Sequence, residues 1–445
     1  MKGNLFTSPF PLRSFPFVFL LFTFYFSLII FSGCDKTTTT PPFPPATPDS
    51  IALVKETFVD PQECGACHPN HLAEWEQSMH HYAITDPVFR KLIEISRQRT
   101  SEPVDEFCIK CHTPLGPMLG ETAHGFDFDS FSALPQNGIF CDACHLVNSK
   151  SIKSGQGLTL KNYRFDKVRR STISDPQKNG FHESAFDNEF NFSRICRSCH
   201  NIEAPSGTFF LEETNIEWDE SPYLGMGVEC QDCHMPVYSG QAALGGPQRD
   251  DLNRHTFVGV DFPLVDFPGK TETIERVRAL LENSVTLTVT APENVSPDAP
   301  IAIDVKIKND RTGHNIPSGS TFERQMWIEL ALINLDSGDT LFASGLLDSR
   351  GDLRNHHSED VANGIVPEDT SLVLFRGIPL DGGGNELMFF WEAKSVGKIP
   401  SPRLNRKQCD IRSPRRINRQ CWKRGCGCAF VRFHPIFCGK SAKKA

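Results

Sequence analysis

The chain has 445 residues, with 46 Lys and Arg against 54 Asp and Glu and a formal net charge of −8. With 39% hydrophobic and 22% charged residues, the composition excludes a collagen-like fibre and a wholly disordered acidic chain, and the length predicts two or three domains. The mild negative charge gives no reason to expect nucleic acid as a partner. The informative numbers are 16 cysteines and 15 histidines, whose spacing must distinguish disulfides, metal sites and cofactor attachment.

The first segment, 1–34, is predicted to be a signal peptide. Phe15 to Phe31 is almost wholly apolar, and its length suits the core of such a peptide better than a full membrane span. The segment ends in Phe31-Ser-Gly-Cys34, which resembles the lipobox of bacterial lipoproteins and would make Cys34 a lipid anchor. An ordinary cleaved signal and an uncleaved anchor helix are the alternatives. All three place the remaining chain on the periplasmic or cell-surface side. The lipid or the anchor helix would also make the membrane a partner.

Residues 35–50 form a Thr/Pro tract that cannot pack a core and is predicted to be a semi-rigid linker. The next segment, 51–270, contains five copies of one motif, Cys-x-x-Cys followed at once by His. The copies are Cys64-Gly-Ala-Cys67-His68, Cys108-Ile-Lys-Cys111-His112, Cys141-Asp-Ala-Cys144-His145, Cys196-Arg-Ser-Cys199-His200 and Cys230-Gln-Asp-Cys233-His234.

Two thiols at positions i and i+3 of a helical turn lie on one face, where they can form thioethers with the two vinyl groups of a haem. The adjacent His is then placed to ligate the iron, and this pattern is typical of c-type haem attachment. Zinc knuckles also use Cys-x-x-Cys, but structural zinc sites pair two knuckles, and five would leave one over. The sequence therefore predicts a pentahaem domain with five covalently attached haem c groups.

A carrier haem has two axial ligands, so five motif histidines require up to five more. The histidines outside the motifs include candidates for this second position. We predict His80, His124, His182, His255 and His314 as these distal ligands, with His71, His81, His356 and His357 as alternatives.

From 284 to 396 the pattern changes to alternation with a period of two, as in Ile301, Ile303, Val305 and Ile307. Short strands separated by turn residues predict an immunoglobulin-like β-sandwich. The expected fold is thus a mainly α or irregular multihaem cytochrome domain, with short helices and a haem-packed core, followed by an all-β sandwich.

The last segment, 399–445, is basic and contains five cysteines. One interpretation is a docking tail or a small disulfide knot. The other is an out-of-frame translation after about residue 397, because loose thiols would interfere with haem attachment in an exported protein.

Six short blocks outside the five motifs resemble those of a known family. They are WEQSMH at 75–80, GIFC at 138–141, FHES at 181–184, EWDESPY at 217–223, HTFVG at 255–259 and GHNIPSG at 313–319. Over about 60 to 330 the chain resembles the multihaem c-type cytochromes related to the tetrahaem electron carrier of ammonia oxidisers. The resemblance implies mostly bis-histidine, low-spin haems and a role in electron transfer. This chain differs from that relative in its five predicted haems and in the added β-domain.

Three functions follow from these features. The first is electron transfer between redox partner proteins, such as a membrane quinol-side donor and a terminal acceptor. The second is reduction of a small molecule such as nitrite or hydroxylamine at one haem with an open iron position. The Cys-x-x-Cys-Lys motif of pentahaem nitrite reductase does not occur in this sequence. The third is a binding module, in which the β-domain docks a partner.

Overall fold

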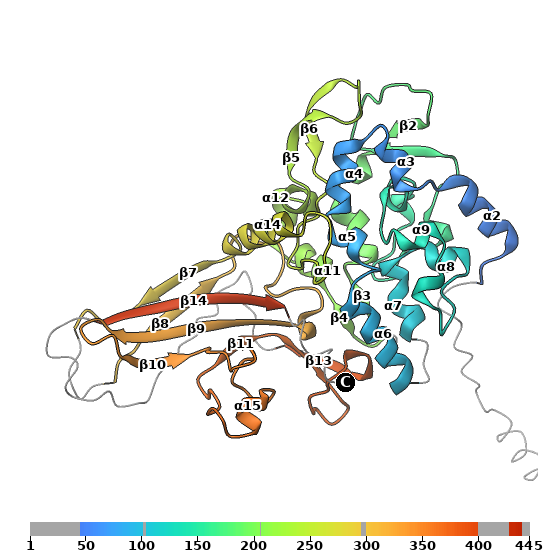
Figure 1. Ribbon diagram of the computed structural model, residues 1–445. Helices are drawn as coiled ribbons and strands as arrows, with labels where there is room; N and C mark the ends of the chain where they lie inside the picture. Colours follow the sequence, from blue (N-terminus) through green and yellow to red (C-terminus); the bar gives the residue numbers. More distant parts are fainter. Residues whose placement is uncertain (1–44, 101–103, 205, 295–299, 399–426, 438–445) are drawn as a thin grey trace, which may run out of the picture. The chain divides into compact units, whose positions relative to one another are not determined.

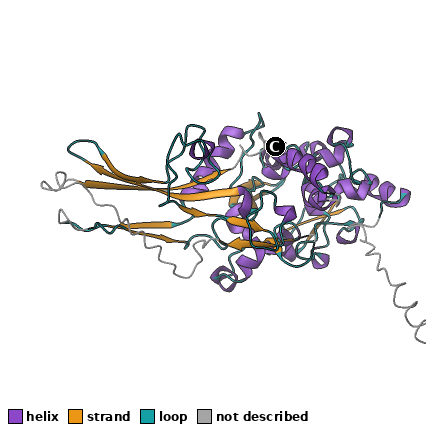
Figure 2. Ribbon diagram, turned by 90° about the horizontal axis from the view of Figure 1, so that it is seen from below, coloured by secondary structure: helices purple, strands orange, loops and turns teal. Residues whose placement is uncertain are grey.

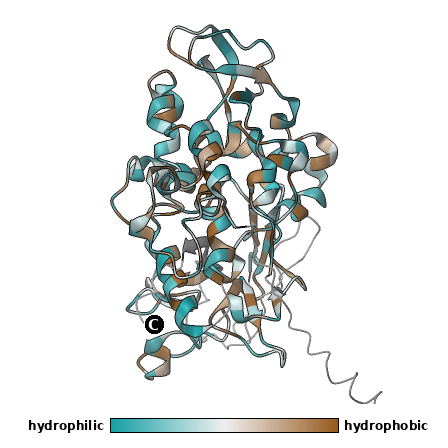
Figure 3. Ribbon diagram, turned by 90° about the vertical axis from the view of Figure 1, so that its right-hand side faces the viewer, coloured by the Kyte–Doolittle hydropathy of each residue, from teal (hydrophilic) through white to brown (hydrophobic). Residues whose placement is uncertain are grey.

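The computed structural model describes residues 45–100, 104–204, 206–294, 300–398 and 427–437, the last of these as backbone only. The predicted signal peptide with its lipobox-like end, and most of the predicted linker, lie outside the described residues. Within the described residues no helix combines the length and the apolar character that a membrane crossing requires. Figure 3 shows apolar and polar positions interleaved along the helices.

The chain is helical first and β-rich later, as the sequence predicts, and Figure 2 shows the helices gathered together and the long strands gathered together. The helices are α2 Pro48–Thr57, α3 Pro61–Gly65, α4 Pro69–Glu76, α5 Met79–Tyr82, α6 Pro87–Arg99, α7 Val104–His112, α8 Leu115–Leu119, α9 Ala133–Gln136, α10 Cys141–His145, α11 Thr214–Asp219, α12 Pro222–Met226, α13 Cys230–His234, α14 Lys270–Glu282 and α15 Glu359–Ala362 (Figure 1).

Three small two-stranded sheets lie within the helical part. They are parallel β1 Val168–Ser171 with β2 Glu183–Phe186, antiparallel β3 Ile202–Glu203 with β4 Phe210–Glu212, and the antiparallel pair β5 Val237–Gln241 with β6 Gln248–Asn253.

The later strands form three further sheets. They are β7 Thr286–Thr290 with β8 Asp304–Lys308, β9 Arg324–Asn334 with β10 Thr340–Ser344, β11 Val373–Phe375 and β14 Gly427–Phe437, and β12 Gly377–Leu380 with β13 Ser395–Lys398. All of these pairs are antiparallel.

The alternating apolar positions of β8 and β9 face one shared core. Val305 and Ile307 of β8 are buried with Met326, Ile328 and Leu330 of β9. A strand with a period of two presents every second side chain to one face, so two such sheets can bury those faces against each other. The predicted β-region is confirmed, while its immunoglobulin-like strand order stays a prediction.

One helix begins inside the segment predicted to be linker. Thr47 caps α2 by accepting a hydrogen bond from Ser50 N, and Pro48 occupies the first turn, where its missing N–H costs nothing. Val54 of this helix is fully buried in a core shared with Trp75, Phe140 and Leu146. Tertiary packing therefore starts a helix that the Thr/Pro composition did not predict.

The predicted tail, 399–445, contains one described element, β14, which pairs with β9 along the whole of that strand. Residues 399–426 and 438–445 lie outside the described residues. Both interpretations of the tail therefore stay predictions.

We expect Ile328→Ala to lower the free energy of unfolding by about 2–5 kcal/mol, because truncation removes buried methyl groups and leaves a cavity. Ile328 is 2% exposed, whereas Val289 of β7 is 39% exposed. Val289→Ala is the matched control and should cost less than about 1 kcal/mol. Far-UV circular dichroism of the haem-loaded protein during urea unfolding measures both. Equal losses for the two variants would contradict the assignment of the β-core.

Candidate functional site

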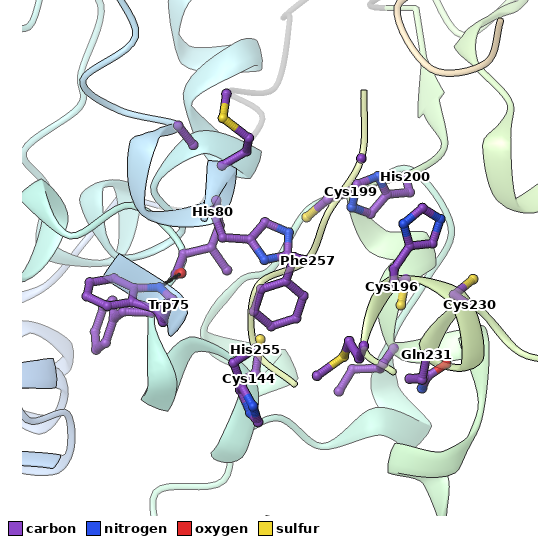
Figure 4. A pocket seen from close by; sticks show the side chains of 18 of the residues that line it. Trp75, His80, Cys144, Cys196, Cys199, His200, Cys230, Gln231, His255 and Phe257 are labelled. Carbon is purple, nitrogen blue, oxygen red and sulfur yellow. Dashed lines mark hydrogen bonds between the residues drawn. The ribbon is translucent and has the colours of Figure 1, made fainter. Parts of the chain in front are cut away.

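A cavity of about 1400 Å³, lined largely by apolar groups, lies among the helices of the first part of the chain. All ten cysteines and all five histidines of the five motifs line it. Figure 4 shows Cys196, Cys199 and Cys230 beside the same space that His80, His200 and Phe257 enter. The structure thus brings the predicted attachment residues together around one continuous volume.

Each motif is wound as a helical turn. The second, third and fifth motifs lie in α7, α10 and α13. In the first motif α3 ends at Gly65, and His68 N donates to Cys64 O at 2.9 Å. In the fourth, His200 N donates to Cys196 O at 3.0 Å. This winding brings both thiols and the imidazole to one side, as the attachment chemistry requires.

Four of the five motif histidines each face a second histidine across the cavity. The pairs are His68 with His182, His145 with His255, His200 with His80, and His234 with His314. Their ring centroids are 6.2 or 6.3 Å apart. Two imidazoles on opposite sides of one metal ion, each with a metal–nitrogen distance of about 2 Å, would place their ring centres about 6 Å apart.

The pairing does not follow chain order. His80 comes shortly after the first motif but faces the histidine of the fourth, and His182 comes after the third motif but faces that of the first. His314 comes from the β-region and faces the fifth motif. Sequence spacing alone could not have assigned these partners.

Hydrogen bonds to backbone carbonyls orient most of these imidazoles. In four motif histidines the Nδ1 atom lies within hydrogen-bonding distance of a backbone carbonyl oxygen. The distances are 2.6 Å for His68 to Ala242 O, 2.8 Å for His112 to Ala83 O, 2.6 Å for His145 to Arg170 O and 2.6 Å for His234 to Val258 O. Three of the histidines that face them are held in the same way. The Nδ1 distances are 3.0 Å for His182 to Glu183 O, 3.0 Å for His255 to Asn253 O and 2.8 Å for His314 to Asn315 O.

A carbonyl oxygen can only accept, so Nδ1 carries the proton in each of these rings and Nε2 keeps its lone pair. This arrangement is the usual support of a metal-ligating histidine. Burial also favours the neutral imidazole, because it lowers the pKa of His80 to about 3 and those of His112 and His200 to about 4. Neutral imidazole is the form that binds metals.

The second motif differs from the other four. Within the described residues no histidine ring pairs with His112 in this way, and Phe89 of α6 stacks on it with ring centroids 3.6 Å apart. The structure does not bring His124, the candidate that follows this motif, into the cavity. His124 Nδ1 instead donates to Asp105 Oδ1 at 2.8 Å, and half of the His124 side chain is exposed. The fully buried Asp105 carboxylate holds it there.

The alternative histidines have other roles. His71 lines the cavity, but its Nε2 is hydrogen-bonded with the Tyr238 hydroxyl at 3.0 Å, which engages the nitrogen that a metal would need. His81 stacks on Trp75, but His81 itself is not among the residues that line the cavity. His356 and His357 lie in the β-region, near Glu386 and Arg376.

Two carboxylates hold cavity histidines and were not predicted. Glu74 accepts a hydrogen bond from His255 N at 2.7 Å and forms an ion pair with Arg254. Glu217 accepts from Asn315 N at 3.1 Å and from Ser318 Oγ at 2.6 Å, which fixes the loop that carries His314. Glu217 belongs to the EWDESPY block. The sequence therefore identified this segment but not the hydrogen bonds by which Glu217 holds the loop of His314.

The residues present fit haem c. Protein interiors contain few voids larger than a water molecule, so an apolar cavity of this size is suited to large planar groups. Its wall presents paired thiols for covalent attachment and neutral imidazoles for iron.

Comparison with known proteins agrees with this geometry. Residues 63–146, which include the first three motifs, match the family described as cytochrome c554 and c-prime. No curated protein and no solved structure matches the chain. The family match supports a haem c electron-transfer protein of the multihaem c-type cytochromes.

We expect His255→Ala to convert one low-spin haem into a high-spin haem, because it removes the imidazole that faces His145. His71→Ala is the matched control: its ring lies 4.5 Å from that of His255, but its Nε2 is hydrogen-bonded to Tyr238. Electron paramagnetic resonance of the oxidised protein counts high-spin haems in each variant. If His71→Ala produced the new signal and His255→Ala did not, the two assignments would have to be exchanged.

Proposed function

We propose that this protein is an extracytoplasmic pentahaem c-type cytochrome that transfers electrons through haems ligated by two histidines. The observation that carries the proposal is the single cavity that collects all five attachment motifs and four histidine pairs. Cys34 would anchor the mature chain to the membrane as a lipoprotein. Its partners would be redox proteins, one on the quinol side of the membrane and one a terminal acceptor.

Contacts between cysteines of different motifs support a route for electrons. The thiol of Cys64 in the first motif lies close enough to that of Cys141 in the third for each to shift the other's pKa, and the same holds for Cys196 of the fourth motif and Cys230 of the fifth. Cys144 of the third motif lies close enough to Cys199 of the fourth for its pKa to be raised by it, after the larger effect of burial. The motifs are therefore neighbours in the order one, three, four, five.

The second motif joins this series at the fourth, because Cys111 and Cys199 lie close enough for each to shift the other's pKa. Haems attached at neighbouring cysteines would lie close together, which fast electron transfer requires. In this arrangement a haem at the fourth motif would exchange electrons with haems at the second, third and fifth motifs.

The second candidate function is reduction of a small molecule at the second motif. The observation that favours it is that His112 faces no second histidine among the described residues, whereas the other four motif histidines do. An iron held there by one histidine would keep a position for a ligand. The electron-transfer proposal needs no such position and stands with or without it.

We expect the pyridine haemochrome assay to give five c-type haems per chain, one for each motif. Cys230→Ala with Cys233→Ala, which removes the fifth attachment site, should give four. A haem content near zero in the wild-type protein would overturn the whole proposal.

For the second candidate, we expect the reduced protein to bind one carbon monoxide per chain, because His112 alone among the five motif histidines faces no second imidazole within the described residues. Optical titration of the dithionite-reduced protein with carbon monoxide measures the stoichiometry. Binding of no carbon monoxide would exclude the reductase and leave electron transfer as the function.

A further inference from the structure

An exposed apolar turn lies in the chain just before the fifth motif. The run 221–228, SPYLGMGV, contains no charged residue and includes α12. Leu224 is 46% exposed and Met226 is 68% exposed. Neither of these side chains lines the cavity, so a group bound in the cavity would not cover them. We call this run, together with its acidic neighbours Asp219, Glu220 and Asp232, the α12 face.

Acidic residues flank the apolar turn on both sides. Asp219 and Glu220 precede it and Asp232 follows it, and all three are exposed. Partial desolvation raises the pKa of Asp219, and Arg197 acts against this shift. Glu229 and Glu220 add to the shift, which shows that these carboxylates lie close to Asp219. The apolar turn therefore has a negatively charged rim.

The sequence explains the excess of negative charge. Between Arg197 and Arg249 there is no Lys or Arg, whereas the same stretch contains eight Asp and Glu residues. Arg311, in the loop before His314, is an exposed cation from another segment. With Arg197 and Arg311 both counted, the four acids near α12 still outnumber the cations.

Hydrogen bonds hold the apolar turn against the wall of the cavity. Trp218 Nε1 donates to Val228 O at 2.9 Å, and the Tyr223 hydroxyl donates to Asp310 O at 3.3 Å. Trp218, Tyr223 and Val228 line the cavity. The α12 turn thus has one side in the cavity wall and the other at the surface. A surface that is fixed before binding loses less entropy when a partner docks on it.

The fifth motif is a suitable place for electrons to enter or leave. It lies at one end of the order one, three, four, five, next to the fourth motif. Among the ten motif cysteines Cys233 is the only exposed one, so this attachment site lies closest to the surface. After the effect of burial, Cys233 raises the pKa of Tyr223, which places α12 beside this site.

We propose that the α12 face docks a small redox protein whose exposed cofactor edge is surrounded by Lys and Arg residues. The inference rests on the proposed electron-transfer function and names the kind of partner that meets the fifth position. One electron passes between the fifth position and the cofactor of the partner, so that one is oxidised and the other is reduced. No bond is made or broken.

The two parts of the face have different roles in this proposal. An apolar centre without charges and a polar rim are typical of protein–protein interfaces. Leu224 and Met226 provide the apolar contact at the centre. The acids of the rim attract a basic partner, orient it and repel acidic proteins. The partner is therefore selected by charge and held by apolar contact.

The test is stopped-flow oxidation of the reduced, haem-loaded protein. The probe is oxidised pseudoazurin, a small blue-copper protein with lysines around its exposed copper edge, because copper absorbs at wavelengths separate from those of haem. We expect the second-order rate constant to fall at least about tenfold between about 10 mM and about 300 mM ionic strength, because salt screens the attraction between the two surfaces.

Asp219→Asn with Glu220→Gln removes two negative charges from the rim. It should lower the rate constant about tenfold at low ionic strength and change it little at high ionic strength. Asp250→Asn with Asp251→Asn is the matched control, since it removes the same charge from exposed positions of β6. This control should behave as the wild type.

Met226→Ala tests the apolar contact. It should lower the rate constant several-fold at both ionic strengths, because salt does not screen an apolar contact. Met388→Ala is the matched control: Met388 is 84% exposed and lies in the β-region. Haemochrome content and the midpoint potentials verify that each variant keeps its haems unaltered.

Several outcomes would overturn the proposal. Wild-type rate constants in both α12-face variants would show that the partner docks elsewhere, and a loss confined to the control at Asp250 and Asp251 would place it at β6. A dimer of the wild-type protein in sedimentation that Met226→Ala dissociates would assign the face to a second copy of the chain. Each result, obtained with five reducible haems, leaves electron transfer intact, whereas absence of haem would remove the proposed function itself.

Discussion

The hydrogen bond that holds an imidazole by its Nδ1 atom is the interaction on which the cavity depends. It fixes the tautomer, turns Nε2 towards the cavity and prevents the ring from rotating. The accepting carbonyls often come from remote segments: Ala242, which serves His68, lies 174 residues further along the chain. Because these acceptors are backbone groups, the histidines are in place only when the strands and loops that carry the carbonyls have folded around them.

This constraint explains why so many short elements surround the cavity. Each motif is a single helical turn, and strand β1 and the turn between β5 and β6 supply carbonyls that such turns cannot provide for themselves. The protein packs its own apolar core around α2, α4 and α10, while the cavity wall is left for large planar groups. Hydrogen bonds such as that from Trp75 Nε1 to Ile139 O, at 2.7 Å, connect this apolar core with the cavity wall.

The second motif stands apart in its ligation. Its histidine stacks on Phe89 and faces no second imidazole among the described residues, and Glu323 lines the same cavity as its cysteines. The β-region contributes to both kinds of site, with His314 for the fifth motif and with Glu323 and Arg324 near the second. The β-region therefore forms part of the cavity wall as well as a neighbouring fold.

The amino-acid sequence by itself determined the five attachment motifs, because two thiols and an imidazole within one helical turn form a purely local pattern. It also determined the order of a helical and a β-rich part, through the change of period near residue 284, and it marked four histidines that enter the cavity. Only the tertiary structure decided which histidine faces which motif and excluded His124 from the cavity. These features depend on segments separated by tens to hundreds of residues, and a contact made by folding leaves no regular spacing in the sequence.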